Sequence, residues 1–154
     1  MPDDFDFSEF SELDRDLVRL ANSTMPKESK KFIRAEGNKL KRVTSKRAKK
    51  DVKVGIKSKK TEKKNVSYHK GIKRGKVYKY HGNDAWAIRV YGSAPHSHLI
   101  EYGHRMVGHK PDKKELGFVK GKYVFENSRK EFEKTYVRDV GKFVDNVIVK
   151  GLTK

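Results

Sequence analysis

The sequence predicts an α+β fold, because helical periodicity marks its two ends and alternating apolar and polar residues mark its middle. Alternation over 52–56 and 76–93 is typical of strands with one face toward a core. A length of 154 residues fits one domain, 1–154. The segments with apolar residues at every third or fourth position are 9–23, 26–49 and 123–149.

The first two helical segments are expected to form an amino-terminal αα-hairpin. Phe10, Leu13 and Leu17 follow helical spacing in the first segment, whose outer face is acidic. Pro26 stands where a second helix would begin, since proline is favoured in the first turn. This second helix has a strongly basic face, so the two helices would have complementary flanks.

The middle of the chain is expected to form a small antiparallel β-sheet that contains a hairpin. The alternating residues 52–56 predict one strand. Residues 57–76 carry many lysines and few apolar side chains, which predicts a mobile basic loop that orders against a partner. The two alternating runs of 76–93 surround HGND, where Gly82 and Asn83 tolerate the positive φ of a tight turn.

The last third of the chain is expected to contain a short helix, a loop and a long helix. HSHLIEYG reads as about two helical turns, ended by Gly103 as a left-handed cap. Residues 106–118 have the composition of a loop. The apolar stripe of 123–149 predicts one amphipathic helix about 40 Å long, packed on the sheet.

Composition excludes several classes of protein. The chain has no cysteine, so it can form neither disulfides nor thiolate metal sites. No apolar run approaches the roughly 20 residues that span a bilayer, and MPDDFDF lacks the pattern of a signal peptide. We therefore expect no membrane partner and a cytosolic protein, unless an assembly carries it elsewhere.

The net charge of +18 is concentrated in one part of the chain. Residues 26–80 carry 22 basic and four acidic groups, whereas residues 1–25 carry two basic and seven acidic groups. Such a block attracts nucleic acid or an acidic protein surface, or it is a solvated loop. The candidate contact residues in the basic loop are Lys57, Lys59, Lys60, Lys63, Lys64, Lys70, Lys73 and Arg74.

Four of the six histidines lie within HSHLIEYGHRMVGH, residues 96–109. His98 and Glu101 would share a helix face, and with His104 they suggest a metal site. The spacing lacks an HExxH pair, and no nucleophile elbow or phosphate loop is present, so we expect no metal site, no enzyme and no cofactor. The alternative is that the histidines line solvent or a subunit contact.

The order of these motifs resembles the tail-completion, or head–tail joining, family of long-tailed double-stranded-DNA bacteriophages. WAIRVYGSAPHSHLIEYGHRMV supplies a strand and a short helix with a Glu-Tyr-Gly-His pattern. A loop and the aromatic start of a long final helix follow, in GKYVFENSRKEF. The resemblance covers residues 85–150, and its motif residues are Tyr91, His98, Glu101, Tyr102, Gly103, Phe125 and Phe132.

The resemblance implies a structural virion protein of the neck, made in the host cytoplasm. Copies of the chain, six by this expectation, would form a ring between the head connector and the tail tube, next to the tail terminator, through which DNA passes. The basic loop would meet DNA phosphates or an acidic neighbouring protein. A non-specific nucleic-acid-binding basic protein is the alternative; the absence of a recognition motif and the low-complexity composition of the basic loop count against it.

Overall fold

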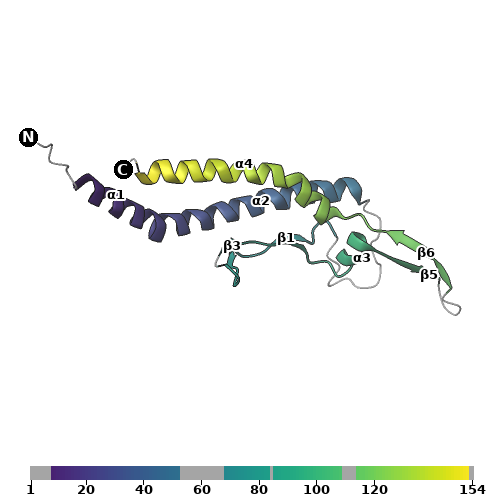
Figure 1. Cartoon of the computed structure of the whole chain (residues 1–154). Coiled ribbons are helices and arrows are strands. Elements are labelled where there is room, and N and C mark those ends of the chain that lie inside the picture. The colour runs from purple at the N-terminus through teal and green to yellow at the C-terminus, as the bar shows by residue number, and fades with distance from the viewer. Residues whose placement is uncertain (1–7, 53–67, 84, 109–113, 153–154) are drawn as a thin grey trace, which may run out of the picture.

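The computed structural model describes residues 8–52, 68–83, 85–108 and 114–152. Within them the fold is α+β, as predicted, with two long helical segments beside three two-stranded antiparallel sheets (Figure 1). The molecule is elongated, and the start of α1 and the end of α4 lie at the end opposite to the β5–β6 ribbon. The helices in chain order are α1 Ser8–Arg19, η1 Leu20–Thr24, α2 Met25–Asp51, α3 Ser97–Tyr102 and α4 Val124–Leu152. The strands are β1 Ile72–Arg74, β2 Tyr78–Lys79, β3 Trp86–Ala87, β4 Val90–Gly92, β5 Gly103–Val107 and β6 Glu115–Lys120.

The expected amino-terminal αα-hairpin is wrong, because α1, η1 and α2 form one bent helical rod. Pro26 does stand in the first turn of α2, but the chain does not reverse before it. The turn η1 is π-helical, and the Met25 N–H donates to the Leu20 carbonyl oxygen five residues back. A π-turn beside a proline bends a helix without ending it, which explains the change of direction in Figure 1.

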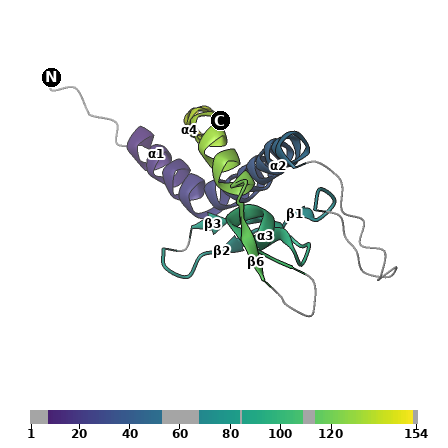
Figure 2. The same cartoon turned by 90° about the vertical axis from the view of Figure 1, so that its right-hand side faces the viewer.

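The antiparallel helix pair is formed instead by α2 and α4, which lie side by side in both views (Figures 1 and 2). The rings of Phe32 and Phe143 stack with centroids 4.6 Å apart. Ion pairs join Lys39 to Asp139 at 2.7 Å and link the same helices again near the sheet. The long final helix is thus confirmed, but its main partner is α2 and not the sheet.

The predicted hairpin around HGND is confirmed, with Tyr78 paired to Ala87 and Lys79 to Trp86. The expectation of a mobile loop through residue 76 is wrong for its last part, because β1 pairs with β4 there. Tyr68 and Ile72 are buried in that part, with 5% and 2% of their surface exposed. Residues 53–67, which include most of the expected strand 52–56, lie outside the described residues.

The core lies where the end of α2, the start of α4 and strand β1 meet. The close approach of α2 to the hairpin depends on Gly37, since a Cβ there would lie 2.7 Å from the Ile88 Cδ1. The buried cluster comprises Ala48, Tyr68, Ile72 and Val124, with Val52, Val90, Ile100 and Phe125 packed against it.

The expectation of a loop over 106–118 is wrong for both of its ends, because residues 106–107 and 115–118 belong to an antiparallel ribbon of β5 and β6, while residues 109–113 lie outside the described residues. Its register shifts between Met106 and Val107, and Gly117 takes a positive φ of 133° beside this irregularity. The ribbon extends away from the helices at the far end of the molecule (Figure 1). In the described part of the chain, no helix combines the length and the apolar character needed to cross a bilayer.

Candidate functional site

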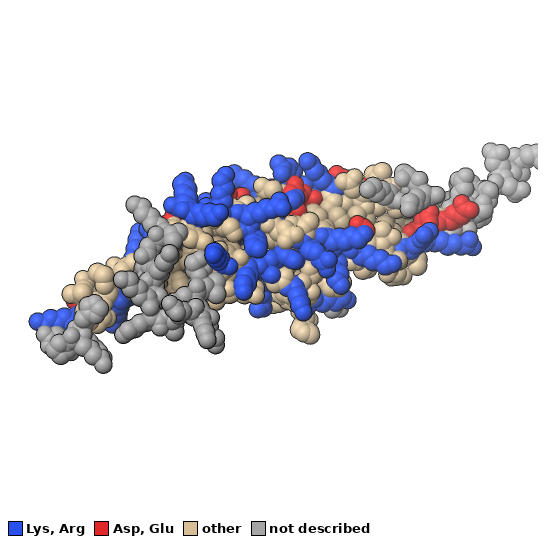
Figure 3. Space-filling view, turned by 180° about the vertical axis from the view of Figure 1, so that it is seen from behind, with Lys and Arg blue, Asp and Glu red and all other residues tan. Residues whose placement is uncertain are grey.

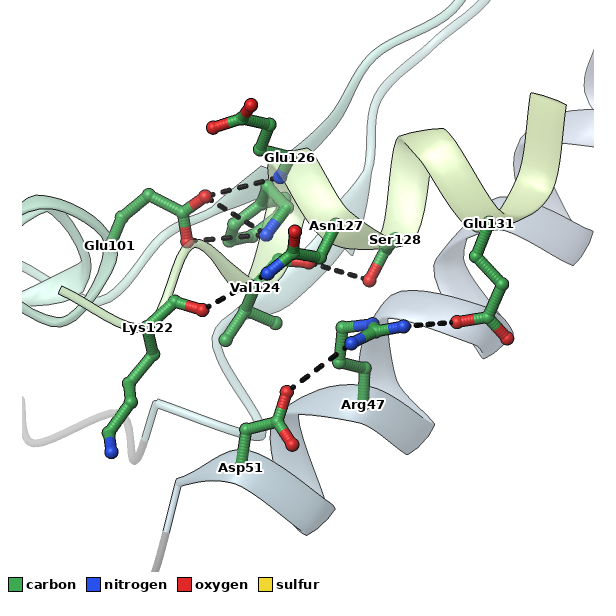
Figure 4. Close-up of polar contacts among 10 residues, drawn as sticks. Arg47, Asp51, Glu101, Lys122, Val124, Glu126, Asn127, Ser128 and Glu131 are labelled. Atoms are coloured by element: carbon green, nitrogen blue, oxygen red, sulfur yellow. Dashed lines mark hydrogen bonds and ion pairs between the residues drawn. The ribbon is translucent and has the colours of Figure 1, made fainter.

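The carboxylate of Glu101, at the end of α3, contacts the first turn of α4 (Figure 4). The Phe125 N–H donates to its two oxygens at 3.0 and 3.2 Å, and the Glu126 N–H donates to one of them at 3.2 Å. The first N–H groups of a helix lack intrahelical acceptors and carry partial positive charge. Glu101, only 7% exposed, therefore acts as a cap supplied from outside the helix.

Backbone hydrogen bonds also join the end of α3 to the start of α4. The Lys122 N–H donates to the Ile100 carbonyl at 2.8 Å, and the Tyr123 N–H donates to the Glu101 carbonyl at 3.1 Å. Tyr123, directly before α4, takes a left-handed φ of 48°, which is uncommon for a residue with a side chain. The end of α3 and the start of α4 thus form one rigid connection.

Two glycines allow the end of α3 to lie close to the chain that leads into α4. Gly103 has a φ of +85° with ψ of 177°, a region that only glycine occupies readily, so it ends α3 by a different conformation from the expected left-handed cap. A Cβ on Gly103 would collide with the Val119 carbonyl oxygen. A Cβ on Gly121 would collide with the Glu101 carbonyl oxygen. We call Glu101, Gly103, Gly121, Phe125 and Glu126 the Glu101 junction.

The side chains of the other motif residues make none of the hydrogen bonds of this junction. Phe132 is buried on α4, with its ring 6.2 Å from that of Tyr136. Tyr91 on β4 and Tyr102 on α3 are 45% and 67% exposed. Sequence spacing gave no sign that Glu101 caps a helix that begins 23 positions later, because that contact depends on how the chain folds back.

Among the described residues, no histidine lies with Glu101 in a group that could hold a metal ion. Both of its carboxylate oxygens accept backbone N–H groups of α4, while His98 is exposed on α3. His104 is partly buried, and His109 lies outside the described residues. In the segments that the structure describes, no group of three or more histidine or acidic side chains is arranged to hold a metal ion.

The β5–β6 ribbon has a conspicuous apolar surface that the described chain leaves uncovered. Every residue of β6 is exposed, although the strand contains three large apolar side chains. Large exposed apolar side chains gathered on one projecting element are typical of contact sites in soluble proteins. The ribbon surface consists of Tyr102, Met106, Val107, Leu116, Phe118, Val119 and Tyr123.

A second apolar surface lies at the opposite end of the molecule, where α1 approaches the last turns of α4. Its side chains are between 36% and 59% exposed. This end is acidic as well, since α1 carries Glu12, Asp14 and Asp16. The terminal surface consists of Leu13, Leu17, Val18, Val144, Ile148 and Val149.

The basic candidates divide between described and undescribed residues. Lys70 and Lys73 are exposed, and Arg74 is partly buried beside Gly37. The five lysines from Lys57 to Lys64 lie outside the described residues. Most lysine and arginine side chains seen in Figure 3 instead run along the body of the molecule, on the side where α2 lies.

Comparison with known proteins finds no relative: no family model, curated protein or solved structure matches the chain. What the chain does is therefore inferred from its own motifs and surfaces.

Proposed function

We propose that the chain is a structural subunit of the head–tail junction of a long-tailed double-stranded-DNA bacteriophage, where copies join in a ring. The observation that carries this proposal is the ribbon surface, an apolar surface on a projecting two-stranded element. Such a ribbon is at best marginally stable alone in water, so it gains from a partner that covers it. The resemblance in motif order described above supports a partner in the phage neck.

The ribbon offers two kinds of contact to a neighbouring subunit. Leu116 and Phe118, 62% and 64% exposed, supply apolar area. Each strand of the ribbon also pairs on one side alone within the described residues, so the free edges offer backbone donors and acceptors for strand addition. Both contacts suit a subunit that is completed by assembly.

The placement of the two apolar surfaces favours a head-to-tail contact. The ribbon surface and the terminal surface lie at opposite ends of an elongated molecule (Figure 1). Contact between two different surfaces of identical subunits generates a ring when the rotation closes. The ring, expected to have six copies, would bind the head connector on one side and the tail terminator and tube on the other.

The Glu101 junction gives this assembly a fixed geometry. It joins the base of the ribbon to the first turn of α4, and α4 extends to the terminal surface. The two surfaces are thus held at a defined separation and angle by one rigid helix. A closed ring needs that constancy, because a small error in angle repeats at every subunit.

The test is deletion of the gene from the phage, followed by complementation. We expect separate filled heads and tails without the chain, and joined particles when it is supplied. Complementation should fail for the double variant Leu116→Ser, Phe118→Ser. It should succeed for the control Tyr80→Ser, Val137→Ser, which alters two exposed apolar residues away from both surfaces. Normal joined particles without the chain would contradict the proposal.

A further inference from the structure

The outward face of α2 is strongly and continuously basic. The side of α2 that faces the protein carries the buried residues Glu36, Gly37, Thr44 and Ala48. The opposite side repeats basic residues at helical spacing, with only short polar residues between them. We define the α2 basic face as Lys27, Lys31, Arg34, Asn38, Lys41, Arg42, Ser45, Lys46 and Lys49.

Most of these charges are not neutralised by the protein itself. Among the described residues, the face has one ion pair, between Lys31 and Glu28 of the same helix at 2.7 Å. The acidic side chains Glu36 and Asp51 instead pair with Lys39 and with Arg47, which lie outside the face. Figure 3 shows the resulting dominance of lysine and arginine on this side of the molecule.

The chemistry of this face favours a polyanion over a protein partner. It contains no aromatic and no large apolar residue, whereas the centres of protein interfaces are rich in aromatic residues and poor in lysine. A shallow concavity on the face is lined by Asn38, Lys41, Arg42, Ser45, Lys46 and Lys49. Amide and hydroxyl donors among lysines and arginines are the groups that contact nucleic-acid phosphates.

The length of the face suits a duplex. From Lys27 to Lys49 it covers 22 residue steps, or about 33 Å at 1.5 Å per residue. One turn of double-stranded DNA is about 34 Å long. A rigid row of cations over that distance can follow the phosphates along one turn.

We propose that the α2 basic face binds the phosphate backbone of double-stranded nucleic acid, without reading its sequence. This site differs from the basic loop 57–76 and does not depend on ring formation. Binding releases condensed counterions, so affinity falls with salt by about 0.9 log units per log unit of salt for each phosphate neutralised.

The test measures binding of the full-length chain to a fluorescent 30-base-pair duplex by anisotropy, between about 50 and 200 mM KCl. The face variant is Lys41→Gln, Arg42→Gln, Lys46→Gln, Lys49→Gln. We expect it to reduce the log–log salt slope by about 3 to 4 and the affinity at 100 mM by at least about 100-fold. The single variant Arg42→Gln should reduce the slope by about 1, which keeps the test valid if the multiple variant fails to fold.

The control variant is Lys120→Gln, Lys122→Gln, Lys134→Gln, Lys142→Gln, with the same loss of charge at exposed positions elsewhere. Its slope should change by less than about 1. Equal slopes in the face and control variants would overturn the site, because net charge alone would then explain binding. Absence of duplex binding at 50 mM, or equally tight binding to poly-glutamate, would overturn nucleic acid as the partner.

Discussion

Replacing Glu101 with alanine removes the acceptor that caps α4, and it is the sharpest test of the Glu101 junction. In this variant the N–H groups of Phe125 and Glu126 lose a charged partner at 3.0 to 3.2 Å. Alanine offers no substitute, and the site is buried, so water replaces the carboxylate poorly. The first turn of α4 and the base of the ribbon should both be weakened.

The expected loss follows from the number and kind of these contacts. Hydrogen bonds to a charged group contribute about 1.5–3 kcal/mol, and the favourable interaction of a carboxylate with a helix N-terminus adds about 0.3–1 kcal/mol. We therefore expect Glu101→Ala to lower the free energy of unfolding by about 3 kcal/mol. In a chain of this length that corresponds to a fall in Tm of roughly 6–12 °C. Glu101→Gln should lose about half as much, because its amide oxygen still accepts one N–H.

The assay is urea unfolding, followed by far-UV circular dichroism and by fluorescence of the single tryptophan, Trp86. The control is Glu126→Ala, which lies in the same helical turn but has an exposed side chain whose ion pair within the described residues is with Lys130. It should leave the urea midpoint nearly unchanged. A loss below about 1 kcal/mol for Glu101→Ala, or equal losses in both variants, would refute the role of Glu101 as a cap.

Four further variants test backbone conformations and charges in the fold. Gly103→Ala should destabilise the fold by at least about 3 kcal/mol, because of its positive φ and the adjacent carbonyl, whereas Gly141→Ala, with open space around it on α4, should stabilise it by about 0.5–1 kcal/mol in the same urea assay. Burial, and then the charge of a nearby carboxylate, raise the pKa of the Tyr68 hydroxyl above its ordinary 10.0. The stability that the neutral hydroxyl contributes is therefore present below pH 10 and is lost as the pH rises further. Above pH 10, Tyr68→Phe should therefore lose less stability than the parent protein. An equal fall in the free energy of unfolding with pH in both proteins would contradict this. The hydrogen bond from Lys39 lowers the pKa of Asp139 below its ordinary 3.8. The stability that the Asp139 carboxylate contributes is therefore present above pH 3.8 and is lost as the pH falls below it. In an acid titration, Asp139→Asn should lose stability less steeply than the parent protein below that pH.

The periodic spacing of apolar residues predicted the elements that bury one face and expose the other. The long helix α4 follows its stripe of apolar residues, of which Phe132 and Val147 are buried. The hairpin of β2 and β3 forms around HGND as predicted, but neither Gly82 nor Asn83 takes the expected positive φ; the Asn83 N–H donates to the Tyr80 carbonyl within a longer connection. In α4, local chemistry and tertiary packing require the same conformation.

The remaining features depend on information that local patterns do not contain. Pro26 is compatible both with the start of a helix and with a bend in a continuous helix. The structure has the bend, because the π-helical turn before Pro26 continues the helix into α2. Strand β6 is exposed along its whole length, so no alternation of buried and exposed positions marks it. The cap by Glu101 joins residues 24 positions apart, and only the folded chain brings them together.

The most direct test of the proposed function is to locate the chain in purified phage particles. Immunogold electron microscopy with an antibody against the chain should place gold at the head–tail junction of long-tailed particles, and mass spectrometry of the same particles should detect the chain. Intact, infectious particles that contain none of it would contradict a role in the neck.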